Sequence, residues 1–360
     1  MKKNNEKLLK NLIFTPSPSG YEGRLTNIIR KELMNYMPKT KITIDFHNNL
    51  IAKIDGKKSN QVVMIDAHLD QLGFMVHNID RYGYISLISI GGHDLSILRG
   101  RKVLVLSERR KPFEGVISTK HAHLIDYRKE KEEIPEHTTD LTLDIGIRNR
   151  RQVAKYVSIG DPLIISPSFD NLTEDFYTGS GFDDKAGVYV LMQVVKEIRR
   201  QHKKPIPTLL FAFSSQEEIG CKGAKELVRR YKPNLFVGID VTCATDSYEV
   251  DEREAGRCEL GKGITLIKGV NIHRPSLKLM QSLARCNKVK VQYQANNGDE
   301  STDADVVGNE LDGIRILNLG IPCRHLHSPV EIINSKDLNY AIHLLKSFLL
   351  SKKLGKVIEK

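Results

Sequence analysis

Glu217 and Glu218 are adjacent carboxylates that follow the apolar, strand-like stretch Leu209–Phe213 in the run T-L-L-F-A-F-S-S-Q-E-E-I-G. Ionised acids at the rim of an apolar sheet need a cation, a proton or a hydrogen-bond network to stabilise them. Active sites of open α/β sheets lie at the carboxyl ends of the strands. We therefore interpret the pair as a metal ligand beside a general base.

Further ligand-type residues follow other apolar stretches or occupy turns. Two-metal hydrolytic centres combine imidazoles with carboxylates, one of them shared, and hold their ions about 3.5–4 Å apart. These candidates are His68 and Asp70 in D-A-H-L-D, Asp183 and Asp184 in F-D-D-K-A-G, Asp240 after L-F-V-G-I, and His327 in R-H-L-H-S-P-V-E.

Each candidate also has a structural interpretation. His68 could be a hydrogen-bonded core histidine, although Asp70 could orient its second ring nitrogen as metal-bound histidines require. Asp183 and Asp184 could cap a helix N-terminus, and Asp240 could end a strand in a turn. The repetition at successive strand ends favours a metal centre.

Composition indicates a globular protein of 360 residues, with 40% hydrophobic and 28% charged residues. Its start reads as an amphipathic helix rather than a signal peptide, and no apolar run approaches the roughly 18 residues that span a bilayer. Five cysteines without a C-x-x-C spacing favour a reduced, cytoplasmic protein. We expect no membrane partner.

The formal net charge is +11, with basic clusters at Arg128–Lys131, Arg148–Arg151 and Arg199–Lys204. Nucleic-acid binding is one interpretation of such clusters. They lack interleaved aromatic residues, however, and acids lie nearby, so we interpret them as solvated surface.

The pattern predicts an α/β fold with a mostly parallel central sheet flanked by helices. Residues 73–166 read instead as short β-rich pieces, which predicts a small β-rich domain inserted between residues 1–72 and 167–360 of a catalytic domain. The elements expected outside the insert are helices near Ser19–Leu33, Asp184–Gln201, Lys222–Arg230, Pro275–Asn287 and Ser335–Ser351, and strands at Lys41–Phe46, Val62–Ala67, Thr208–Phe213, Leu235–Val241 and Val289–Tyr293.

The ordered motifs resemble the tetrahedral aminopeptidases, co-catalytic zinc and cobalt metallopeptidases that include glutamyl and leucyl aminopeptidases, some labelled endoglucanases. The similarity runs nearly end to end. It is carried by P-S-P-S-G-Y-E, D-A-H-L-D-Q-L-G-F-M-V, L-D-I-G with G-D-P-L, F-D-D-K-A-G, S-S-Q-E-E-I-G, I-D-V-T, L-G-K-G, S-T-D-A and H-S-P-V-E. The resemblance implies a phosphorylase/hydrolase-like peptidase domain that removes N-terminal amino acids from peptides.

The resemblance also implies roles for individual residues. One ion would be held by His68, Asp183 and Asp240, and the other by Asp183, Glu218 and His327. Glu217 would be the general base that activates a metal-bridging hydroxide, and Asp70 would orient His68. We expect two divalent ions per subunit, zinc or cobalt, with manganese also compatible with such ligands.

By the same resemblance, the β-rich insert would assemble subunits into a homo-oligomer, a dodecamer of dimers. Four positions depart from the family pattern: Gln71, Lys185, Glu300 and His325. None removes a ligand. No residue fixes the preferred N-terminal amino acid, although the net positive charge weakly favours acidic side chains.

Three alternatives remain open at this point. A deacylase or amidase could act on N-acyl amino acids with the same site. A glycosidase would use two carboxylates about 5–10 Å apart without needing a metal. A basic, non-enzymatic scaffold or nucleic-acid binder would have no need of intact ligands.

Overall fold

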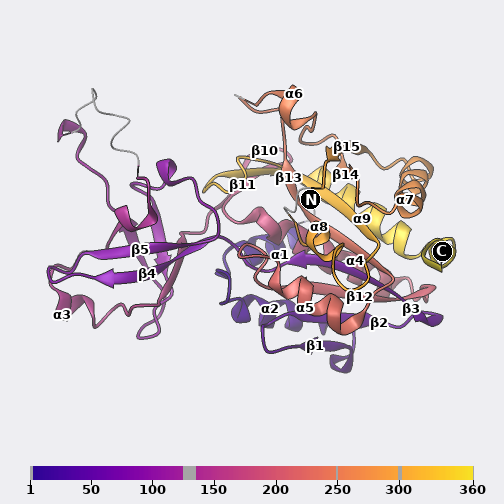
Figure 1. Cartoon of the computed structure of the whole chain (residues 1–360), viewed down its shortest axis with the longest axis horizontal. Coiled ribbons are helices and arrows are strands. Elements are labelled where there is room, and N and C mark those ends of the chain that lie inside the picture. Colours follow the sequence, from indigo (N-terminus) through magenta and orange to yellow (C-terminus); the bar gives the residue numbers. More distant parts are fainter. Residues whose placement is uncertain (1–2, 125–134, 249, 299–301, 360) are drawn as a thin grey trace.

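The computed structural model describes residues 3–124, 135–248, 250–298 and 302–359. Figure 1 shows a large sheet with its helices, and a smaller group of strands that projects from one side of it. The α-helices are α1 (Lys3–Ile13), α2 (Gly23–Leu33), α3 (Arg150–Val153), α4 (Phe182–Arg200), α5 (Lys222–Tyr231), α6 (Glu252–Ala255), α7 (Arg274–Cys286), α8 (Asp303–Val307), α9 (Ser335–Leu349) and α10 (Leu354–Glu359).

The large sheet has the strand order β1-β2-β12-β3-β13-β16-β17-β11-β10, with β14 joining β16 and β15 joining β14. Its central strands β12, β3, β13 and β16 are parallel, and the strands toward the two edges are antiparallel. The strands are β1 (Ile42–Ile44), β2 (Leu50–Ile54), β3 (Lys58–His68), β10 (Phe169–Thr173), β11 (Phe176–Gly179), β12 (Pro207–Ser214), β13 (Leu235–Cys243), β14 (Ile264–Gly269), β15 (Val291–Asn296), β16 (Ile316–Arg324) and β17 (Glu331–Asn334).

Helices cover both faces of the sheet centre. Every residue of β12 is buried, and because neighbouring residues of a strand point to opposite faces, both faces must be covered. Helix α4 packs on β3, β13 and α9, while α5 and α8 pack together on β12 and β13. The contact between β13 and α8 is so close that a Cβ at Gly238 would lie 2.7 Å from the Cβ of Ala304.

The smaller body is a closed antiparallel barrel in the order β4-β5-β8-β7-β6-β9. It has its own apolar core, which includes the fully buried Phe74, Leu87 and Leu163. Its strands are β4 (Gly73–Ile79), β5 (Ile85–Ile90), β6 (Lys102–Val105), β7 (Phe113–Ile117), β8 (Thr142–Asp144) and β9 (Pro162–Ile165).

The predicted fold class is confirmed: the centre of a large sheet is parallel and flanked by helices, and a small β-rich body is inserted. The boundaries at residues 72/73 and 166/167 and the assembly role of the insert stay predictions. Helices α4, α5, α7 and α9 begin within two residues of their predicted positions. Strand β16, which lies inside the sheet beside β13, was not predicted from the sequence.

Two predicted details differ in the structure. The strand expected at Val289–Tyr293 is β15, shifted toward the C-terminus to Val291–Asn296. At the start of α4 the backbone of Asp183 is extended rather than helical, with φ −74° and ψ 113°. The basic cluster Arg128–Lys131 and Glu300 lie outside the described residues.

Candidate metal centre

The candidate ligands come from neighbouring parallel strands and the loops that follow them. His68 is the last residue of β3 and pairs in register with Ser214, the last residue of β12. Glu217 and Glu218 follow β12, and Asp240 lies near the end of β13. Because β12, β3 and β13 are adjacent and parallel, their carboxyl ends deliver these side chains to one edge of the sheet.

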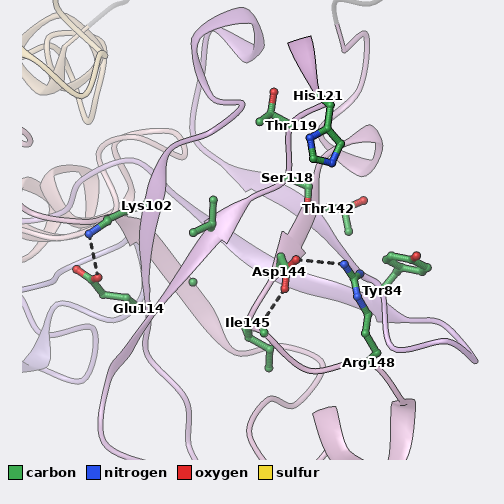
Figure 2. A pocket seen from close by; sticks show the side chains of 13 residues that line it. Tyr84, Lys102, Glu114, Ser118, Thr119, His121, Thr142, Asp144, Ile145 and Arg148 are labelled. Carbon is green, nitrogen blue, oxygen red and sulfur yellow. Dashed lines mark hydrogen bonds and ion pairs between the residues drawn. The ribbon is translucent and has the colours of Figure 1, made fainter. Parts of the chain in front are cut away.

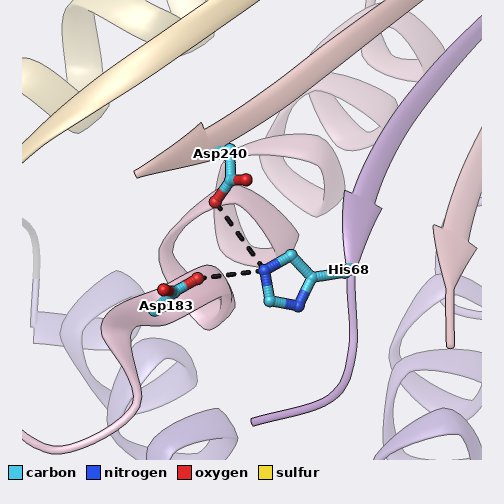
Figure 3. Close-up of side chains that lie close together, drawn as sticks. All are labelled: His68, Asp183 and Asp240. Atoms are coloured by element: carbon cyan, nitrogen blue, oxygen red, sulfur yellow. Dashed lines mark hydrogen bonds and ion pairs between the residues drawn. The ribbon is translucent and has the colours of Figure 1, made fainter. Parts of the chain in front are cut away.

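One group of possible ligands consists of His68, Asp183 and Asp240. The Nε2 atom of His68 lies 2.9 Å from Oδ1 of Asp183 and 3.7 Å from Oδ1 of Asp240. Figure 3 shows both carboxylates directed at the same ring nitrogen from two different elements. One atom from each residue lies within 4.8 Å of the others, which is close enough to bind a single ion.

A second group consists of Asp183, Glu218 and His327. The Nε2 atom of His327 lies 3.1 Å from Oδ2 of Asp183 and 3.8 Å from Oε2 of Glu218. These ligand atoms also lie within 4.8 Å of one another. Asp183 thus belongs to both groups, with Oδ1 toward His68 and Oδ2 toward His327.

The electrostatics of the two groups fit bound cations. Burial and then the charge of Asp183 raise the pKa of Glu218 to about 9, and its Oε1 is buried without a hydrogen-bond partner. Burial also raises the pKa of Asp240. Burial lowers the pKa of His68, but Asp183 and Asp240 outweigh it and raise that pKa well above its usual range. Buried carboxylates with raised pKa values are stabilised in their ionised form by a nearby positive charge.

The donor set fits the metals expected from the sequence. Each group offers one imidazole and two carboxylates and no thiolate, a combination that suits zinc, cobalt or manganese. Asp184, in contrast, points elsewhere: its Oδ1 accepts a hydrogen bond from the backbone N–H of Gly187 at 2.9 Å. The helix-capping interpretation therefore applies to Asp184, whereas Asp183 faces the two imidazoles.

The carboxylate of Asp70 is fully buried and holds the loop that carries both glutamates. It accepts hydrogen bonds from the backbone N–H groups of Glu217 at 2.9 Å and Glu218 at 3.1 Å, and from the Ser19 hydroxyl at 2.6 Å. Although burial opposes it, contacts with His68, Ser19 and Glu217 lower the pKa of Asp70.

Asp70 also contacts His68, as the sequence analysis expects, but in a different way. The Nδ1 atom of His68 lies 3.1 Å from the backbone carbonyl oxygen of Asp70 and 3.5 Å from its carboxylate. The backbone carbonyl therefore orients the ring most directly, and the carboxylate serves mainly the two glutamates.

Glu217 lines a cleft of about 650 Å³ together with all five candidate ligands. Burial, followed by the charges of Asp303 and Asp240, outweighs the opposing effect of His68 and raises the pKa of Glu217 to about 10. A cation bound nearby would lower this pKa. The side chain thus lies where a general base is expected, beside the ligands rather than among them.

Two buried contacts were not foreseen from the sequence. Oε2 of Glu331 accepts hydrogen bonds from the backbone N–H groups of Phe182 at 2.6 Å and Asp183 at 3.4 Å, which fixes the chain at the shared carboxylate. The only signal for Glu331 was its place at the end of H-S-P-V-E. Lys185, a departure from the family pattern, donates to the side chain of Gln71, which is another departure.

Lys185 and Gln71, the two residues that depart from the family pattern, are thus hydrogen-bond partners of each other. The Lys185 ammonium is fully buried and also donates to the backbone carbonyl of Thr15 at 3.0 Å. Both partners are neutral, and burial lowers the pKa of Lys185 to about 7. His325 is exposed and is absent from the residues that line the cleft.

A larger hollow, of about 690 Å³, lies on the barrel and contains none of the candidate ligands. Figure 2 shows charged side chains around it, with Lys102 paired to Glu114 and Arg148 paired to Asp144. These pairs are 3.6 Å and 3.4 Å long and largely exposed. The candidate ligands and the candidate base therefore lie in the cleft and not in this hollow.

Comparison with known proteins decides the family. The model of the M42 glutamyl aminopeptidase family matches residues 48–344. The chain belongs to the M42 family. A lysyl aminopeptidase of Pyrococcus furiosus is 28% identical, with 95% of this chain and 96% of that protein covered. No helix among the described residues is both long and apolar enough to cross a membrane.

Solved structures place the M42 chain among tetrahedral peptidases. A TET1 peptidase of Pyrococcus horikoshii is 27% identical with a TM-score of 0.84, covering 96% of this chain and 99% of that one. A TET aminopeptidase of a Thaumarchaeota archaeon shares the fold with a TM-score of 0.90 at 23% identity, over 99% and 98% of the two chains. As an M42 member, the protein is a metal-dependent aminopeptidase, a hydrolase.

Proposed function

We propose that this M42 chain is a two-metal aminopeptidase that removes N-terminal amino acids from peptides. The observation that carries the proposal is the position of Asp183, whose two carboxylate oxygens lie 2.9 Å from His68 and 3.1 Å from His327. A carboxylate placed between two imidazole-containing groups is the arrangement that a shared ligand needs.

His68, Asp183 and Asp240 would hold one ion, and Asp183, Glu218 and His327 the other. Such ions, when bound, polarise the scissile carbonyl and lower the pKa of water. Zinc or cobalt is favoured by the family resemblance, and manganese is compatible with the same ligands.

Glu217 acts as the general base. It accepts a proton from the attacking water while the water oxygen bonds to the scissile carbonyl carbon. As the peptide C–N bond breaks, Glu217 donates this proton to the leaving amine nitrogen. The Asp70 carboxylate holds the backbone at Glu217 and Glu218, so that base and ligand keep their separation during turnover.

We also propose that residues 73–166 form an assembly domain and that subunits associate into a dodecamer in the cytoplasm. The barrel has its own core, and the TET1 peptidase of P. horikoshii is described as assembling into a tetrahedron or a large octahedral shell. Peptides are the proposed substrates.

The test is a panel of amino-acid p-nitroanilides, assayed with chelated protein and with protein reconstituted with zinc, cobalt or manganese. We expect hydrolysis of free-amine substrates that disappears on chelation and returns with metal. The matched N-acetylated substrates should not be cleaved. Faster cleavage of N-acetylated substrates, or activity that persists in the metal-free protein, would refute the proposal.

A further inference from the structure

The loop that carries Glu217 and Glu218 is held by side chains from three other segments of the protein. Four consecutive backbone N–H groups each donate to a side-chain oxygen: Ser215 to Asn49 at 2.8 Å, Gln216 to Glu22 at 3.2 Å, Glu217 to Asp70 at 2.9 Å and Glu218 to Asp70 at 3.1 Å. Because a buried N–H group needs a partner, these acceptors fix the direction of each peptide group. Of the acceptors, Glu22 has no assigned part in the proposed chemistry.

The carboxylate of Glu22 is fully buried and has few partners. Its Oε1 accepts the N–H groups of Gly20 at 2.7 Å and Gln216 at 3.2 Å, and its Oε2 has no hydrogen-bond partner among the described residues. Burial and then the charge of Asp70 raise the pKa of Glu22 to about 7, although the N–H groups of Gly20 and Gln216 oppose the shift. A buried carboxylate is costly unless it is paired and hydrogen-bonded, so stability alone does not explain this one.

Helix capping does not explain the side chain of Glu22 either. The residue stands at the N-cap of α2, where a polar side chain commonly accepts an N–H group of its own helix. The Glu22 side chain makes no such bond. It bonds instead to Gln216, which is 194 positions away in the chain. The carboxylate therefore serves the loop after β12 rather than the helix on which it begins.

The bond from Gln216 to Glu22 holds an unusual backbone conformation. Gln216 has a φ of +60°, in the left-handed region that residues other than glycine adopt only when their surroundings impose it. The reversal at this residue turns the next two N–H groups toward Asp70, while the side chains of Glu217 and Glu218 line the cleft. A relaxed Gln216 would rotate the peptide group that leads into Glu217.

The motif P-S-P-S-G-Y-E, which ends in Glu22, acts on this loop in two ways. Glu22 binds the N–H group of Gln216 directly. The Ser19 hydroxyl donates to the Asp70 carboxylate at 2.6 Å, and that carboxylate binds the next two N–H groups. The motif thus supports the whole turn, although it supplies none of the candidate metal ligands.

We propose that Glu22 is a positioning residue for the hydrolysis. It fixes the backbone at Gln216 and thereby the direction from which Glu217 reaches the attacking water. The inference rests on the proposed function, in which Glu217 is the base. Glu22 is absent from the residues that line the cleft, so it acts through Glu217 rather than on the substrate, and its removal should change kcat more than KM.

The test measures kcat and KM of the full-length protein at saturating metal, with the fastest p-nitroanilide of the panel. Glu22→Asp should lower kcat by roughly tenfold or more, because a displacement of about 1 Å at a catalytic group is costly. The shorter acid cannot reach both Gly20 and Gln216, and aspartate at an N-cap favours its own helix. Glu22→Ala, which removes both bonds, should have at least the same effect. Glu22→Gln should keep most of kcat, since its amide oxygen can accept the same two N–H groups.

Asp337→Asn is the matched control. Asp337 is also a buried carboxylate that accepts two backbone N–H groups, from Gly261 at 2.6 Å and Gly263 at 2.8 Å, and none of these three residues lines the cleft. This variant should lower the melting temperature but leave kcat of the folded, metal-loaded protein unchanged. An equal loss of kcat in Asp337→Asn and Glu22→Asp would overturn the inference.

A double variant separates positioning from general support of the fold. In a Glu217→Gln protein, Glu22→Asp should lower the residual kcat far less than it does in the unaltered protein, because the group on which Glu22 acts is already lost. The same factor of loss in both backgrounds, or unchanged kcat in both Glu22→Asp and Glu22→Ala, would overturn the positioning role. Absence of hydrolysis by the unaltered protein would instead contradict the proposed aminopeptidase function.

Discussion

At the scale of single residues, the arrangement of the site depends on which oxygen of each carboxylate faces which neighbour. Asp183 presents one oxygen to each imidazole, whereas the adjacent Asp184 caps its own helix. Asp70 uses both of its oxygens on the backbone that follows β12. Neighbouring acids of the same type therefore have different tasks, and substitutions at them should give different results.

Glu217→Gln should lower kcat by about 10²- to 10⁴-fold, since proton transfer by a positioned base contributes that much. The amide keeps the shape of the side chain but cannot accept the proton. Metal content per chain, measured by mass spectrometry, should stay normal. Glu218→Gln is the comparison variant and should lose metal. Full turnover by the Glu217→Gln protein would exclude Glu217 as the base.

Asp70→Asn should lower metal affinity or activity by about 10- to 100-fold, the usual effect of removing a group that supports metal ligands. The amide nitrogen cannot accept the N–H bond that one carboxylate oxygen now receives. Competition with a chelator gives the metal affinity, and kcat and KM are measured with saturating metal. Ser19→Ala removes a single donor to the same carboxylate and should have a smaller effect. Unchanged affinity together with unchanged kcat would contradict the positioning role.

At the scale of elements, the parallel strands determine where the ligands meet, and close packing keeps the loops in place. The loop after β12 ends at α5, where a Cβ at Gly223 would lie 2.3 Å from Oδ1 of Asn49 and 2.4 Å from the backbone oxygen of Ser215. The same Asn49 oxygen accepts the N–H of Ser215 at 2.8 Å. This contact therefore connects α5 to the segment that leads to Glu217.

Gly223→Ala should destabilise the fold by about 1–3 kcal/mol, the usual cost of overpacking a tight contact. Because the displaced segment carries the glutamates, activity should fall as well. Thermal unfolding and kcat/KM are measured side by side. Lys222→Ala, at the exposed neighbouring position, should change neither. A Gly223→Ala protein with unchanged stability would show that the contact can relax without cost.

At the scale of the whole molecule, the proposed metal centre predicts that stability depends on bound cations, because the ligand carboxylates are buried. A ligand that binds only the folded state stabilises it by about 2.7 kcal/mol at a hundredfold excess over its Kd. Chelation should therefore lower the melting temperature, and added zinc or cobalt should restore it. The Asp183→Asn protein should respond less, because both groups lose a carboxylate. Equal melting temperatures with and without chelator would argue against metal at this site.

The assembly proposal makes a second prediction at this scale. Light scattering after size exclusion should give a particle close to twelve times the chain mass of 40.8 kDa. Moderate changes in salt concentration should not dissociate this particle, because salt weakens ion pairs and leaves apolar contacts between subunits intact. A monomer at micromolar concentration would contradict the dodecamer, while leaving the catalytic proposal intact.

Much of the fold could be predicted from the sequence because the relevant signals are local. Apolar runs followed by acids or histidine marked the ends of β3, β12 and β13, and helical periodicity located α4, α5, α7 and α9. Strands β17, β11 and β10, which lie toward one edge of the sheet, were not predicted, because strands so short carry little pattern. Neither was β16, whose run I-L-N-L-G-I-P-C-R mixes apolar, polar and small residues.

The sequence by itself determined the types of ligand, their order and the resemblance that assigned them, because these depend on residue chemistry and short motifs. Only the tertiary structure decided which carboxylate oxygen faces which imidazole, that Asp70 binds the backbone of both glutamates, and that Lys185 meets Gln71. Such contacts join residues separated by 114 to 148 positions, and their geometry follows from strand order and packing rather than from local pattern.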